Sequence, residues 1–175
     1  YGRTVLDGTM AVGQNWFGGD SKFFRIFATG NRTINLPKGH KLVLRGKAQY
    51  TPDSLPPVQQ IAFGGAYTVR GYTEGLMVRE RGYYGSIEHF WPVPFLNRVS
   101  EDLSSRIRGV TFFDIGQGWR DKSNAAFGGG ISAKKRSLLM ATGIGVRYKL
   151  NQYLQGFADM AWGLGSRNAI ELNAD

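Results

Sequence analysis

The stretch SLLMATGIGVRYKL, residues 137–150, decides the fold. Apolar side chains fill most of its even positions, and small or polar side chains fill many of its odd positions. The apolar set is Leu138, Met140, Ile144, Val146, Tyr148 and Leu150, and the opposite set includes Ser137, Gly143, Gly145, Arg147 and Lys149. Because successive side chains of a β-strand point to opposite faces, this alternation predicts a strand with one apolar face.

The same alternation recurs along the chain. Residues 41–51 and 153–165 repeat it clearly, and four further segments repeat it more weakly: 3–13, 22–36, 81–91 and 104–119. The 25 glycines and the 11 Phe, 8 Tyr and 4 Trp residues are also typical of turn-rich β structure. The sequence therefore predicts an all-β fold with seven strands.

Hydropathy alone does not reveal a membrane protein, since no apolar run reaches the roughly 18 residues of a spanning helix. A barrel strand needs only about 10 residues with one apolar face. Along the chain, long predicted connections mostly alternate with shorter ones. Connections 14–21, 52–80 and 120–136 are long, and connection 37–40 is short. A soluble sandwich or lipocalin-like barrel has no reason to sort connection lengths by end, whereas an outer-membrane barrel does. We expect a transmembrane antiparallel β-barrel.

The first predicted strand then runs outward, and residues 166–175 enter an external loop that has no return strand. We therefore expect the chain, residues 1–175, to be the C-terminal part of a barrel. Seven predicted strands and one missing return strand make eight. These eight strands could be a small closed barrel or half of a larger one, and we favour a barrel of sixteen strands.

Three motifs follow one another in the second half of the chain. The long connection 52–80 holds FGGAYTVRGY at 63–72, with Val69, Arg70, Gly71 and Tyr72. Residues 81–88 read RGYYGSIE and are followed by WPVPF at 91–95, and residues 112–116 read FFDIG. In this order the motifs resemble those of the two-partner secretion (TpsB) transporters, which belong to the outer-membrane assembly factor and surface antigen superfamily. The likeness covers about residues 61–165, while the first 60 residues carry no comparable signature.

The resemblance implies a Gram-negative outer-membrane pore of the type V secretion class, which exports an unfolded adhesin-like or haemolysin-like exoprotein. Its expected partners are that exoprotein and the lipid and lipopolysaccharide of the outer membrane, and the barrel is expected to be monomeric. The alternative within the same superfamily is an insertase that assembles other barrels at a seam between strands.

The long connection 52–80 and the segment 104–119 carry side chains of opposite charge. Alternation places Asp114 and Gly116 on one face of segment 104–119, together with Arg106 and Arg108. A 29-residue loop, 52–80, can reach far along a barrel at about 3.3 Å per residue, and arginine has a forked guanidinium that suits a carboxylate. We expect the loop to fold into the lumen, where Arg70 pairs with Asp114 and Glu88 and Tyr72 lie nearby. The resemblance implies the same pair and matches Phe112, Asp114 and Gly116 to a barrel-wall motif. The alternative is an exposed Arg70, with Asp114 paired locally to Arg106 or Arg108.

Other functions have weaker support in the sequence. Only His40 and His89 could serve as histidine catalysts, and both are interpreted as surface or membrane-interface residues, so we expect no enzyme. The chain lacks cysteine, and no metal or other cofactor is expected. The net charge of +9 and the Arg-Gly-Tyr clusters suggest a soluble β-sheet module that binds nucleic acid only as a remote alternative.

Overall fold

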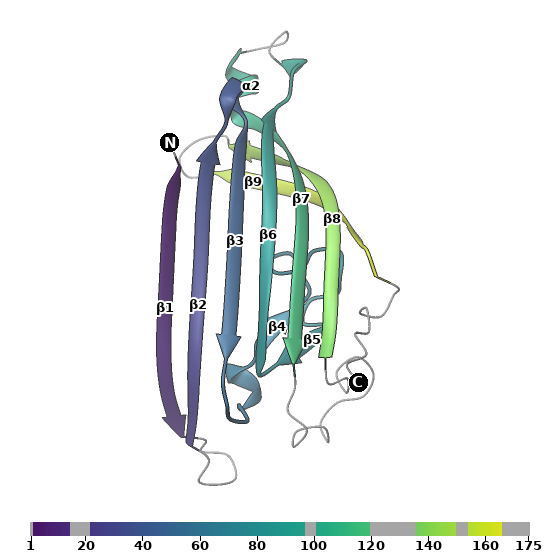
Figure 1. The fold of residues 1–175 in the computed structure, drawn as a ribbon. Helices are drawn as coiled ribbons and strands as arrows, with labels where there is room; N and C mark the ends of the chain where they lie inside the picture. Colours follow the sequence, from purple (N-terminus) through teal and green to yellow (C-terminus); the bar gives the residue numbers. More distant parts are fainter. Residues whose placement is uncertain (1, 15–21, 97–100, 120–135, 150–153, 166–175) are drawn as a thin grey trace.

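The computed structural model describes residues 2–14, 22–96, 101–119, 136–149 and 154–165. Its main element is an antiparallel sheet of seven strands in the order β1-β2-β3-β6-β7-β8-β9 (Figure 1). The strands are β1 (Arg3–Gln14), β2 (Lys22–Asn35), β3 (Lys41–Tyr50), β6 (Arg81–Pro92), β7 (Ile107–Trp119), β8 (Arg136–Lys149) and β9 (Gln155–Gly163). Each corresponds to one of the seven predicted segments, so the predicted all-β antiparallel class is confirmed. Because β1 and β9 are edge strands, the described residues form an open sheet.

One predicted strand begins too early. Residues 104–106 belong to helix α2 (Glu101–Arg106), and β7 starts only at Ile107. The prediction that Arg106 lies on the strand beside Arg108 is therefore wrong. Arg106 ends the helix instead, and its Nε donates a hydrogen bond of 2.8 Å to Oδ1 of Asp102, one helical turn earlier. No helix in the described part of the chain is long and apolar enough to cross a membrane.

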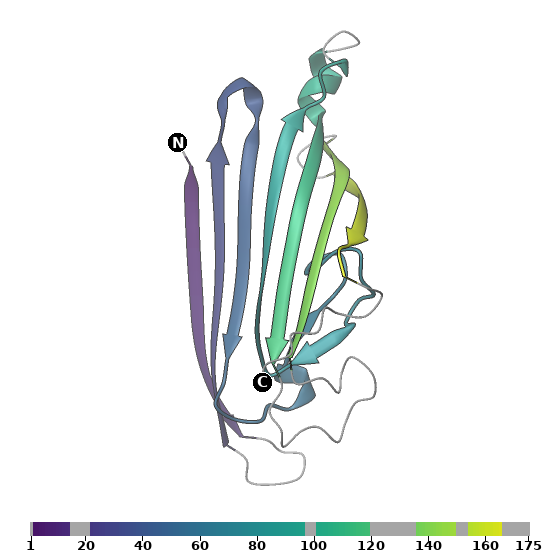
Figure 2. The ribbon, with the colours of Figure 1, turned by 45° about the vertical axis from the view of Figure 1, so that its right-hand side comes forward.

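The connection between β3 and β6 has structure of its own. It contains a 3₁₀ turn, η2 (Pro57–Gln59), and a hairpin of β4 (Ile61–Phe63) and β5 (Met77–Arg79). A second 3₁₀ turn, η1 (Pro37–Gly39), joins β2 to β3. Figure 2 shows that the β4–β5 hairpin lies to one side of the large sheet. Strands of three residues are too short for alternation to predict, so this hairpin carries no signal in the sequence.

The hairpin defines the two faces of the sheet, because it covers one of them. We call that face the inner face; its strand residues include the cross-strand row Lys47, Tyr84, Gly116 and Leu139. A buried core of Ile61, Phe63, Val69, Met77, Leu139 and Ala141 forms between the hairpin segment and this face. The buried core of the described residues therefore lies on the inner face of the sheet.

The opposite, outer face is apolar and bare. Met10 on β1 is 75% exposed, and Met160 and Trp162 on β9 are 63% and 52% exposed. Ile87, Phe113 and Ile144 continue this surface across the middle of the sheet. A water-soluble protein rarely leaves so continuous an apolar surface uncovered, whereas lipid covers it at no cost. The outer face therefore has the character of a membrane-facing wall.

Candidate functional site

A loop between β4 and β5 folds back along the inner face. We call residues 64–76 the inner loop. Its neck is closed by a hydrogen bond of 3.3 Å from the backbone N–H of Gly75 to the carbonyl oxygen of Gly64. From this neck the loop carries Val69, Arg70, Gly71 and Tyr72 to strands β6 to β9. It thereby brings the tetrapeptide to residues that are distant in the sequence.

Arg70 forms a fork with Asp114 at the centre of the site. Nε of Arg70 donates to Oδ2 of Asp114 at 2.7 Å, and Nη2 donates to Oδ1 at 2.8 Å. The backbone N–H of Arg70 also donates to Oδ2, at 3.1 Å. Asp114 is fully buried and Arg70 is 6% exposed, so the pair is shielded from water. Two parallel bonds of this kind fix orientation as well as distance.

Two more carboxylates and two more arginines join the pair. Nη1 of Arg70 donates to Oε1 of Glu88 at 2.7 Å and to Oδ2 of Asp159 at 3.2 Å. Arg45 also forms an ion pair with Glu88, and Arg147 forms one with Asp159. Three guanidinium groups thus balance three carboxylates, Glu88, Asp114 and Asp159. Because these carboxylates are buried or nearly buried, the matching number of guanidinium groups avoids the cost of an unpaired carboxylate.

A hydroxyl and an aromatic ring complete the environment of Arg70. Nη2 of Arg70 donates to Oγ of Ser86 at 3.0 Å, and that hydroxyl donates to Oδ1 of Asp114 at 2.7 Å. The guanidinium carbon lies 3.4 Å from the centroid of the Phe112 ring. Burial alone would lower the pKa of Arg70, but the hydrogen bond and charge of Asp114, followed by those of Glu88, raise it above its ordinary value. Arg70 is therefore a permanent cation at this site.

Glycines on the wall make room for the inner loop. A Cβ atom added at Gly116 would lie 2.7 Å from Cγ2 of Val69, so any side chain there would displace the loop. Gly71 has a positive φ of 82°, and a Cβ atom on it would lie 3.1 Å from the backbone nitrogen of Gly163. The glycine of the tetrapeptide thus permits both the backbone conformation and the close approach to β9.

Tyr72 makes a second polar contact between the inner loop and the wall. Its hydroxyl donates a hydrogen bond of 2.9 Å to the backbone oxygen of Met140 on β8. We expect Tyr72→Phe to destabilise the docked loop by about 1 kcal/mol, because the substitution removes one neutral hydrogen bond and keeps the ring. Hydrogen exchange of the loop amides measures this change. Tyr67→Phe is the matched control, because Tyr67 is 81% exposed; an equal response to both substitutions would contradict the assignment.

Some of the predicted site residues contact one another in the structure, and others lie apart from the site. It brings Arg70, Glu88, Phe112 and Asp114 into direct contact, and it packs Val69 against Gly116. Arg108 lies further along the inner face, where its Nη1 donates to the carbonyl oxygen of Gly39 at 3.0 Å. Alternation had placed Arg147 on the polar face of its strand, but it gave no sign that Arg45, Arg147 and Asp159 join the network around Arg70.

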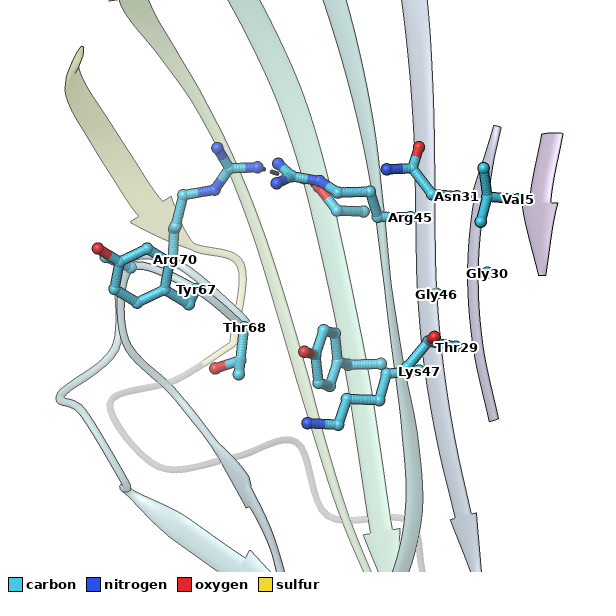
Figure 3. Close-up of a pocket in the computed structure, with 13 residues that line it drawn as sticks. Val5, Thr29, Gly30, Asn31, Arg45, Gly46, Lys47, Tyr67, Thr68 and Arg70 are labelled. Atoms are coloured by element: carbon cyan, nitrogen blue, oxygen red, sulfur yellow. Dashed lines mark hydrogen bonds between the residues drawn. The ribbon is translucent and has the colours of Figure 1, made fainter. Parts of the chain in front are cut away.

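The inner loop leaves part of the inner face uncovered. A cavity of about 330 Å³ separates the loop from β1 to β3. Figure 3 shows Tyr67, Thr68 and Arg70 on the loop side, facing Arg45, Lys47 and Thr29 on the strands. The strand side of the cavity carries the polar and basic residues Thr29, Asn31, Arg45 and Lys47, and the cavity lies directly beside the Arg70 network. The inner loop therefore covers one part of the inner face and leaves an open cavity along another.

The two histidines lie together, away from this site. Nδ1 of His40 is 3.0 Å from Nε2 of His89, and the rings stack with centroids 5.1 Å apart. His89 is on the outer-facing side of β6, opposite Leu42 of β3. Within the described ranges, no group of three or more His, Cys, Asp or Glu side chains could hold a metal ion.

Comparisons with known proteins agree with this geometry. Residues 4–167 match the model of the Omp85 superfamily domain. Among solved structures, CdiB from Acinetobacter baumannii is similar with a TM-score of 0.62 and 21% sequence identity. That likeness, which is one of fold, covers 93% of this chain but only 27% of CdiB, so the chain spans about a quarter of that protein's length. A search of curated proteins finds no match. The family match and the apolar outer face lead to one conclusion: the chain belongs to the Omp85 superfamily and forms part of a β-barrel of the Gram-negative outer membrane.

Proposed function

We propose that this chain is part of a two-partner secretion pore that exports an unfolded exoprotein, of the adhesin or haemolysin type, to the cell surface. The observation that carries the proposal is the inner loop, which Arg70 holds against one side of the inner face while a cavity of about 330 Å³ stays open beside it. In the proposal this cavity is part of the export passage. In this proposal, the inner face lines the lumen of a monomeric barrel of about sixteen strands, and lipid and lipopolysaccharide surround the outer face.

The passage has a surface that suits an unfolded chain. Its strand side carries Thr29, Asn31, Arg45 and Lys47, which offer hydrogen bonds and charge but no deep apolar pocket. Such a lining solvates a polypeptide without holding it strongly, which transport requires. The inner loop acts as a plug or brace whose position sets the width of the passage, and the role needs neither catalysis nor a cofactor.

The superfamily match is compatible with both functions, and the motifs favour secretion. The superfamily match covers 164 of the 175 residues, from 4 to 167. The three motifs resemble those of TpsB transporters, and the solved relative CdiB shares the fold. An insertase would instead work on its clients at a seam between strands. The two functions therefore predict contacts at different surfaces.

Site-specific photo-crosslinking in the full-length protein distinguishes these functions. A photo-reactive residue in place of Lys47, on the inner face, is expected to capture an exoprotein arrested during export. The matched control is Ala48, the next residue along β3, which points to the outer face. Capture at Ala48 rather than Lys47, or capture of nascent barrels only at the strand seam, would overturn the pore and favour the insertase.

A further inference from the structure

A second cavity on the inner face is strongly basic. It has a volume of about 650 Å³ and lies between the tip of the inner loop and the strand ends near η1 and α2. Seven arginines and lysines line it, against two carboxylates, Glu88 and Asp159. Both carboxylates already belong to the network that holds Arg70. The remaining cations give this end of the inner face an excess of positive charge.

Three of these cations have no carboxylate partner within the part of the chain that the structure describes. Lys41 lies with its Nζ 4.5 Å from the centroid of the Phe90 ring, Arg108 donates to a backbone oxygen, and Lys149 is exposed. Arg106, in contrast, is paired with Asp102. We call Lys41, Arg108 and Lys149 the cationic arc. Its members come from β3, β7 and β8 and face one cavity.

The strand register places like charges side by side at this point. Arg108 on β7 lies directly opposite Arg147 on β8, and Lys149 is two residues further along β8 on the same face. Like charges in directly opposite positions destabilise a sheet. Arg147 is compensated by Asp159, but no carboxylate of the described residues compensates Arg108. The fold thus bears an electrostatic cost that a bound anionic group would relieve.

We propose that the cationic arc binds acidic segments of the polypeptide that passes through the barrel, an inference that rests on the proposed function. The arc lies on the inner face, on the opposite side of the sheet from the apolar surface, so lipid that covers the outer face does not contact it. It lies at the end where the short connection 36–40 joins two strands, which in outer-membrane barrels is the periplasmic end. An exported chain enters there, and a basic cavity with low-dielectric walls attracts its carboxylates.

A direct binding measurement tests the arc. The probe is a fluorescent oligoglutamate peptide, titrated against the full-length protein in detergent and followed by fluorescence anisotropy, with oligolysine as the opposite-charge probe. We expect oligoglutamate to bind with an affinity that falls as salt rises, and Lys41→Gln with Lys149→Gln to weaken it roughly tenfold. The matched control combines Arg32→Gln with Lys38→Gln. It removes the same charge near the same end, but from the outer-facing side of β2 and from η1.

The outcomes separate the two proposals. Equal binding by the two double variants, or equal binding of oligoglutamate and oligolysine, would overturn the arc as an acidic-segment site. Exoprotein secretion by cells that carry the unmodified protein is measured in parallel. If the arc variant loses peptide binding but cells with the unmodified protein secrete no exoprotein, the arc is supported as a binding site and the secretion function is refuted. If cells secrete the exoprotein but the protein does not bind oligoglutamate selectively, the secretion function is supported and the arc is refuted.

Discussion

Replacement of Arg70 with alanine is expected to release the inner loop from the wall. The substitution leaves Asp114, Glu88 and Asp159 with only Arg45 and Arg147 to balance them, and Asp114 is fully buried. Removal of one partner from a buried ion pair costs about 3–5 kcal/mol, because the remaining charge stays in a low-dielectric environment. Hydrogen exchange of the inner-loop amides should therefore accelerate by about 100- to 4,000-fold, since each 1.4 kcal/mol corresponds to about a factor of ten.

Arg45→Ala is the matched control for this prediction. Arg45 also pairs with Glu88, but its side chain is 49% exposed, so its removal should have a much smaller effect. A double-mutant cycle of Arg70→Ala and Asp114→Ala isolates the central pair, and we expect strong non-additivity. Additive effects would show that the two residues are not coupled. A simple charge swap is a poorer test, because a carboxylate at position 70 would face Glu88 and Asp159.

A charge on the outer face is expected to prevent assembly of the barrel in the membrane. Ile144 lies in the middle of β8, is 46% exposed, and belongs to the apolar outer surface. Ile144→Arg should destabilise the membrane-inserted barrel by about 2–4 kcal/mol, which is the cost of an arginine on the lipid face near the bilayer midplane. The measurement is the unfolding free energy in lipid vesicles, together with the amount of protein recovered in the outer membrane.

The control places the same residue on the other face. Thr9→Arg puts an arginine in an exposed position on the inner face of β1, directly opposite Phe27 of β2. Because that face is polar, the substitution should leave insertion nearly unchanged. Equal sensitivity of the two faces would contradict a lipid-facing outer wall.

The strands could be predicted from the sequence because each face has a constant environment. Lipid outside and a polar interior impose the same alternation on every strand. The pattern seen in residues 137–150 therefore also identified the other six strands. The rule failed where tertiary contacts replaced it. Residues 104–106 continue the alternation by chance, but the Asp102–Arg106 pair belongs to a helix. Strands β4 and β5 are stabilised by the core around Phe63 and Met77, which no local pattern reveals.

The candidate site shows the same division. Strand alternation gives the face of Asp114, and the loop motif singles out Arg70. Neither could indicate that Asp159, which is 89 residues from Arg70 in the sequence, reaches the same guanidinium. That contact depends on the way β8 and β9 bend around the inner loop, a property of the whole sheet. Ser86 was missed for a related reason, since a serine on a polar face carries no distinctive signal.

The contacts of Arg70 have a mechanical consequence for the sheet. Its guanidinium bonds to side chains of β6, β7 and β9, of which β9 is hydrogen-bonded to neither of the others. On the intervening strand β8, Gly143 makes room for the Phe112 ring on which Arg70 stacks, because a Cβ atom at position 143 would overlap that ring. The Arg70 guanidinium therefore links three strands of the sheet at one point. We expect the loss of this one side chain to let these strands move apart, so that the loop stabilises the curvature of the wall as well as filling part of its inner face.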